Sequence, residues 1–142
     1  MGAINATGST YDQRNGCVPV THSFSVAYNT SGIASAIKIP GLKVKASATK
    51  PVLIRVDCAV GTVFNAATTN VLTLGTSSTA TEIVAAAGIN EASATFQANV
   101  GALKVTADAD IYVKYAQTGT AATTGAADFY ITLTELNPLA IV

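Results

Sequence analysis

The sequence predicts an all-β domain, a jelly-roll-like β-sandwich or barrel with one short helix. Three observations lead to this fold class. Hydrophobic residues make up 49 % of the 142 positions and charged residues only 11 %, against about 25 % in an average domain. Threonine, valine and isoleucine, which favour strands, are abundant. Short segments that alternate apolar with polar side chains recur along the chain, with turn residues between them.

The chain divides into an N-terminal arm, residues 1–17, and a single β-sandwich domain, residues 18–142. The arm consists mostly of Gly, Asn, Thr and Ser and shows no alternation. It also lacks the basic stretch and apolar core of a secretory signal peptide, so none is predicted. The length that remains suits one domain rather than two.

The first and clearest strand covers residues 20–28, where Val, His, Phe, Val and Tyr alternate with Thr, Ser, Ser and Ala. Such strict alternation is typical of a half-buried strand. Pro40 and Gly41 are expected to end the second strand, and residues 108–110 to form a hairpin turn. The further predicted strands are 33–39, 42–47, 52–58, 71–74, 95–100, 102–107, 111–116 and 128–136.

One segment, residues 78–88, is predicted to be helical. Thr79 and Glu82 have the spacing of a capping box, in which each side chain bonds a free backbone N–H of the first turn. Gly88 suits the left-handed position that follows a helix. A helix of about two turns is expected to close one end of the sandwich.

The chain is not expected to be an enzyme. Nucleophilic catalysis needs a hydroxyl or thiol beside a base, and the single histidine, His22, belongs to an apolar strand face without a neighbouring nucleophile motif. We expect it at the edge of the core. Cys17 and Cys58 form no close-spaced motif, and Cys58 shares the face of Val and Ile residues in its strand, which predicts a core position.

No metal or other cofactor is predicted. Structural zinc needs about four Cys or His ligands, and the chain has two cysteines and one histidine. Asp108, Asp110 and Asp128 could approach one another and hold an ion, but their spacing matches no calcium motif. The alternative interpretation is that they are solvated carboxylates of turns.

Charge is distributed unevenly along the chain. The net charge is zero, which argues against nucleic acid as a partner, and no run of about 20 apolar residues could span a membrane. Residues 38–57 form a basic segment with a net charge of +4, and the rest of the chain has a net charge of −4. Two such patches of opposite sign could steer docking, unless the fold scatters them. The basic segment has one acid, Asp57, against five cations, which are Lys38, Lys43, Lys45, Lys50 and Arg55.

Two segments resemble a known family. Residues 71–75, Val-Leu-Thr-Leu-Gly, look like the short strand-Gly element of small jelly-roll capsid cement or decoration proteins of tailed bacteriophages. Residues 112–136 are similar to the closing hairpin of those proteins: Tyr-Val-Lys-Tyr, then Gly-Thr-x-x-Thr-Thr-Gly, then an alternating strand. The resemblance covers about half of the chain.

The resemblance implies a structural virion protein, made in the host cytoplasm and placed on the capsid exterior. Its partner would be the major capsid protein, whose neighbouring subunits it would bridge, and it would form a homo-oligomer, a dimer or trimer. The predicted contacts include the apolar C-terminal tail, residues 139–142, which would favour aggregation if it were exposed. The candidate partner contacts are Lys38, Lys43, Lys45, Lys50, Arg55, Tyr11, Leu139, Ile141 and Val142.

Two alternatives remain at this point. A ligand- or glycan-binding β-sandwich domain of a phage fibre or tail would present exposed tyrosines beside converging polar groups. A minor capsid protein or the base of a head fibre would share the physical properties of a decoration protein.

Overall fold

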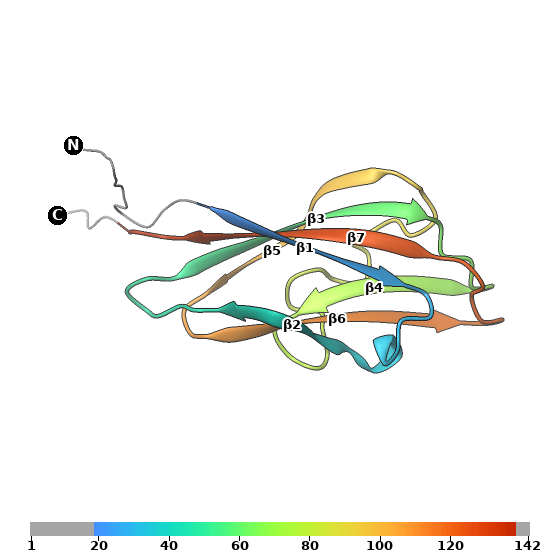
Figure 1. The fold of residues 1–142 in the computed structure, drawn as a ribbon, viewed down its shortest axis with the longest axis horizontal. Coiled ribbons are helices and arrows are strands. Elements are labelled where there is room, and N and C mark those ends of the chain that lie inside the picture. Colours follow the sequence, from blue (N-terminus) through green and yellow to red (C-terminus); the bar gives the residue numbers. More distant parts are fainter. Residues whose placement is uncertain (1–18, 139–142) are drawn as a thin grey trace.

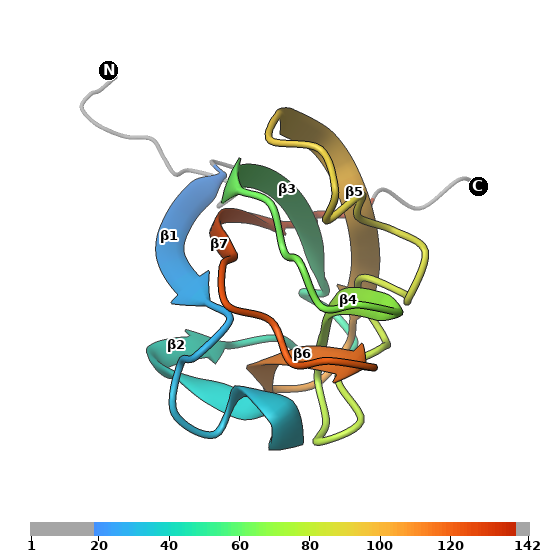
Figure 2. The same ribbon diagram turned by 90° about the vertical axis from the view of Figure 1, so that its right-hand side faces the viewer.

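The computed structural model describes residues 19–138, which form two antiparallel sheets packed face to face (Figures 1 and 2). The predicted all-β sandwich is therefore confirmed. Its elements are β1 (Val20–Ala27), the short 3-10 helix η1 (Ile33–Ser35), β2 (Ile37–Val44), β3 (Val52–Thr62), β4 (Thr69–Gly75), β5 (Phe96–Val105), β6 (Ala109–Thr118) and β7 (Ala126–Glu135).

The strand order is that of a jelly roll with one strand replaced by a loop. One sheet has the order β1-β7-β3-β5 and the other β2-β6-β4, so consecutive strands alternate between the sheets. An eight-stranded jelly roll would place a fourth strand beside β4. Residues 76–95 lie there instead, and one β-bridge, between Leu74 and Val84, is all the strand pairing they make with β4.

Alternation along the strands builds the core between the sheets. In β3 the buried side chains Val52, Ile54, Val56, Cys58 and Val60 alternate with residues that face outward. The opposite sheet contributes buried side chains of the same kind. They are Leu72, Leu74, Ile111, Val113 and Tyr115.

Pro40 and Gly41 do not end a strand, contrary to the sequence prediction. β2 runs through both residues, and its pairing with β6 shifts between Lys38 and Lys43. Gly41 has φ 74°, which glycine adopts without steric cost. Because β2 is an edge strand, a proline without an N–H is tolerated there. The preceding residues 33–35 form η1 rather than strand.

The two predicted hairpins are wrong. Residues 108–110 lie where the chain passes from β5 in one sheet to β6 in the other. The segment 112–136 likewise joins β6 to β7 across the sandwich, and these two strands do not pair. A short connection suits a crossing between sheets as well as a hairpin, so local sequence cannot separate the two.

The predicted helix at residues 78–88 is also wrong, because this segment forms turns along the edge of β4. Leu74 exchanges backbone hydrogen bonds with Val84, at 3.3 and 3.0 Å. Two helical turns are too short to be stable by themselves, and the free edge of β4 offers unpaired backbone groups instead. The Thr79–Glu82 pair has the spacing of a capping box but closes a turn.

Two glutamates complete the edge of β4. The Glu91 side chain, only 7 % exposed, accepts a hydrogen bond from the Leu72 amide at 2.8 Å. Glu82 accepts one from the Thr76 amide at 2.9 Å. The same loop covers β5, because a Cβ on Gly101 would lie 2.9 Å from the Ile83 carbonyl carbon. One side of the sandwich is thereby closed, and β1 and β2 form the edges of the other side (Figure 2).

Glu82 makes this loop sensitive to acid. Burial raises the pKa of Glu82, but hydrogen bonds from Ser77, Thr79 and Thr76 outweigh it and lower this pKa to about 2, from 4.5. The folded form thus binds the proton more weakly than the unfolded form, and the stabilisation present above pH 4.5 is lost as the pH falls towards 2. We expect the protection factor of the Thr76 amide, the exchange rate of an unfolded chain relative to its own at the same pH, to fall over this range. In Glu82→Gln it should change much less, and equal pH profiles in both proteins would contradict the assignment.

Candidate protein-interaction surface

The cysteine and the histidine of the described residues lie in different environments. Cys58 is fully buried, and burial, with smaller contributions from Glu91 and Asp128, raises the pKa of its thiol to about 12. His22 is exposed on β1, on the strand face that also carries Phe24 and Val26, and it lines the mouth between the sheets with Val20. Within residues 19–138 no three His, Cys, Asp or Glu side chains are grouped to hold a metal ion.

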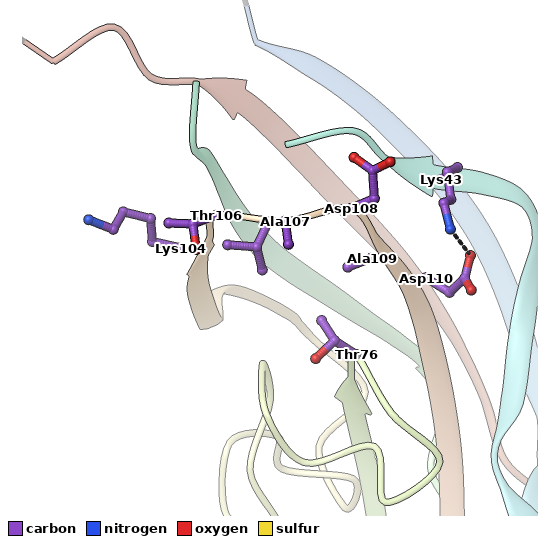
Figure 3. Close-up of a pocket in the computed structure, with 9 residues that line it drawn as sticks. Lys43, Thr76, Lys104, Thr106, Ala107, Asp108, Ala109 and Asp110 are labelled. Atoms are coloured by element: carbon purple, nitrogen blue, oxygen red, sulfur yellow. Dashed lines mark hydrogen bonds and ion pairs between the residues drawn. The ribbon is translucent and has the colours of Figure 1, made fainter. Parts of the chain in front are cut away.

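Three lysines of the basic segment, Lys38, Lys43 and Lys45, pair with aspartates of the β5–β6 connection and the start of β6. Figure 3 shows one of these pairs, Lys43 with Asp110. Lys43 and Lys38 lie 3.5 and 4.0 Å from the Asp110 carboxylate. Lys45 lies 3.1 Å from the Asp108 carboxylate, which also accepts the Ala46 amide at 2.9 Å. The Ala46 hydrogen bond, followed by the one from Lys45, lowers the pKa of Asp108.

The cluster holds three lysines and two aspartates, a net charge of +1, and each of these lysines lies within 4.0 Å of a carboxylate. An open hollow of about 480 Å³ borders it, lined by Thr76, Lys104 and Asp110 among others. In Figure 3 the Lys104 side chain points away from both aspartates. Exposed pairs of this kind contribute little to stability, because water screens their charges. Lysines of the basic segment therefore pair in the fold with acids from a distant part of the chain.

The other predicted contact residues are not brought to this cluster. Lys50 is exposed in the β2–β3 loop, and Arg55 lies on the opposite sheet, where its guanidinium is 3.5 Å from the Asn99 side chain. Asp128, on β7, bonds Ser25 and not Asp108 or Asp110. The remaining predicted contacts lie outside the described residues: Tyr11, Leu139, Ile141 and Val142, as does Cys17.

The outer face of the sheet β1-β7-β3-β5 carries an exposed aromatic pair. Phe96 of β5 and Tyr130 of β7 lie on either side of β3, with ring centroids 6.3 Å apart. Phe96 is 61 % exposed, more than the other large hydrophobic residues of the described chain. An aromatic side chain that pairs with a neighbour and still faces solvent is typical of a contact surface.

Polar groups on the same face are mostly bonded to one another. The Asp57 carboxylate accepts the Asn99 amide at 2.6 Å, and the Asp128 carboxylate accepts the Ser25 hydroxyl at 2.5 Å. These bonds fix the groups around the aromatic pair, so the surface presents two rings in a firmly held polar rim. Such a combination matches the centre and rim of protein interfaces.

Phe96 was not predicted as a surface residue, although its position in the sequence contains a signal. Phe96 is separated by odd numbers of residues from Leu103 and Val105 of the same strand, so alternation places it on the opposite face. The sequence alone therefore places the Phe96 ring on the solvent-facing side of its strand. The prediction divided β5 into two strands, residues 95–100 and 102–107. It therefore did not relate Phe96 to Leu103 and Val105.

The chain was compared with protein-family models, with curated proteins and with solved structures, and none of them matches it. No helix in the part described, residues 19–138, is long and apolar enough to cross a membrane. The fold and surface thus define the class, a jelly-roll-like β-sandwich with an exposed aromatic face.

Proposed function

We propose that this protein is a structural virion component that decorates a phage capsid and bridges neighbouring major capsid subunits. The observation that carries the proposal is the exposed Phe96–Tyr130 pair on the outer face of the larger sheet. The jelly-roll strand order agrees with what the resemblance implied. An exposed sheet face that carries two adjoining aromatic rings suits a broad protein surface better than a small molecule.

The mechanism is burial of apolar surface, with no bond made or broken. Covering the exposed part of Phe96 contributes about 1–2 kcal/mol per copy. The lysine–aspartate cluster adds little to affinity, because its lysines already pair with carboxylates within the domain. Where two copies are joined, simultaneous contacts on a repeating capsid raise the overall avidity without new contacts.

Replacement of Phe96 tests the proposal. Phe96→Ser is expected to weaken binding to particles about 5- to 30-fold, since the apolar contact at the centre is lost. The measurement is co-sedimentation of the purified chain with phage particles from its source in a density gradient. The matched control is Val63→Ser, because Val63 is also exposed, at 36 %, and is not part of the aromatic pair.

Two results would contradict the proposal. Wild-type protein that stays at the top of the gradient would show that particles are not its partner. Binding that is equally strong for wild type, Phe96→Ser and Val63→Ser would remove the aromatic pair from the contact.

The same observation supports a second candidate function, a ligand- or glycan-binding domain of a fibre or tail. Sugar rings stack on aromatic faces, and Asp57 and Asp128 lie close enough on neighbouring strands to accept hydroxyl hydrogen bonds. A glycan array separates the two functions. A signal that Phe96→Ser abolishes, together with no binding to capsids, favours the glycan-binding function.

A further inference from the structure

The edge strand β1 has backbone groups that no residue of the described chain pairs. Tyr28 donates its amide to Gly125, at 2.9 Å, so even-numbered residues of this strand point their backbone groups towards β7. Ala27 directs its backbone groups away from β7, and Thr30 bonds both of them. The Ala27 amide donates to the Thr30 hydroxyl, and the Ala27 carbonyl accepts the Thr30 amide. By the same alternation Thr21, Ser23 and Ser25 direct their N–H and C=O groups to the open edge.

The other three edges are protected. Residues 76–95 cover β4 and β5. β2 has Pro40, a register shift and two lysines, devices that prevent edge pairing. In contrast, β1 pairs all eight of its residues with β7 without a bulge, and contains no proline and no Asp, Glu, Lys or Arg. A long, regular and uncharged edge of this kind is competent to pair with another strand.

We propose that a second copy of this chain occupies this edge, with β1 antiparallel to the partner's β1 and a two-fold axis at Ser23. The three outward residues then form closed pairs, Ser23 with its own counterpart and Thr21 with Ser25. About six backbone hydrogen bonds result, and the larger sheets of two copies join into one continuous sheet.

The side chains of β1 are compatible with a second copy of the same strand, because none of them is Asp, Glu, Lys or Arg. On the outer face hydroxyl side chains meet hydroxyl side chains, since Thr21, Ser23 and Ser25 are all exposed. On the inner face the same register places His22 beside the partner's Phe24. It also covers Val20, which is 53 % exposed in one copy. A closed, isologous dimer uses up both edges and prevents further strand addition.

Charges at the axis test the register. Ser23→Lys places two ammonium groups opposite each other and should weaken the dimer roughly fivefold, whereas a mixture of Ser23→Lys with Ser23→Asp should restore a mixed dimer. Ser23→Pro removes the two hydrogen bonds across the axis and should weaken the dimer about 30-fold. The measurement is light scattering during size-exclusion chromatography of the full chain over a concentration series, with circular dichroism as the check of folding.

The control is Ser78→Lys, the same change at an exposed serine of the 76–95 loop, which should leave the dimer intact. A wild-type chain that is monomeric throughout the series would overturn the proposal. So would a dimer that Ser23→Lys and Ser23→Pro leave unchanged. Loss of the dimer in Ser23→Lys without recovery in the mixture would overturn the axis at Ser23. None of these outcomes depends on capsid binding.

Discussion

Phe129→Ala is expected to lower the free energy of unfolding by about 3–5 kcal/mol. Phe129 is fully buried in β7, between β1 and β3, and stacks on Phe24 with ring centroids 5.2 Å apart. Its removal leaves a cavity in the middle of the larger sheet, where paired strands on both sides prevent collapse.

Urea denaturation followed by circular dichroism measures this loss. The matched control is Phe96→Ala, since Phe96 is 61 % exposed and should change stability by about 0.5 kcal/mol or less. The two phenylalanines thus separate folding from binding. A larger loss from Phe96→Ala than from Phe129→Ala would contradict the assignment of core and contact surface.

Glu91→Ala is expected to cost about 1–3 kcal/mol, because the Leu72 amide loses its acceptor in a buried place. Glu91→Gln keeps an oxygen acceptor of the same size. It should be at least as stable as wild type at pH 7, since it avoids burial of a charge. Thermal or urea denaturation of the three proteins compares them directly, and equal losses for both variants would contradict the role of the hydrogen bond.

The dependence on pH gives an independent check on Glu91. Burial raises the pKa of this carboxyl and outweighs the lowering by the Leu72 hydrogen bond. The folded form therefore binds the proton more tightly than the unfolded form, and the stability gained is present below pH 4.5 and lost as the pH rises through the raised pKa. Relative to Glu91→Gln, wild type should lose stability as the pH rises over this range. A constant difference would contradict the raised pKa.

The sequence was sufficient to predict the strands whose two faces differ in polarity. β1 and β3 alternate strictly, and their predicted inward residues from Phe24 and Val52 onwards are the ones that pack in the core. It could not predict where a strand tolerates a break, because Pro40 is compatible with β2 only as an edge strand. Pairing of strands across the sandwich depends on contacts far apart in sequence, so the hairpins were mispredicted.

The helix at residues 78–88 was wrongly predicted because no fourth strand of the described chain lies beside β4. The capping-box pattern of Thr79 and Glu82 is local, and their side chains are bonded to each other, at 2.7 Å. What decides against a helix is the unpaired edge of β4, which bonds Val84 and Glu91 instead. No pattern within residues 78–88 reveals that edge.

The candidate site was predictable only in part. The basic segment could be recognised from the sequence. Its surroundings could not, because the pairing of β2 with β6 places Lys43 directly opposite Asp110. Charge separation along a chain therefore does not imply separate patches in the fold. The aromatic pair depends on Phe96 and Tyr130 meeting across β3, a relation that exists only after the sheet is formed.

Hydrogen–deuterium exchange of the full chain, with and without phage particles from its source, tests the central claim most directly. The account predicts slower exchange on binding in peptides that cover residues 96–99 and 128–132, which surround the aromatic pair. Peptides that cover residues 63–68 should be unchanged. Protection confined to the lysine–aspartate cluster, at residues 43–46 and 108–110, or no protection at all, would contradict the account.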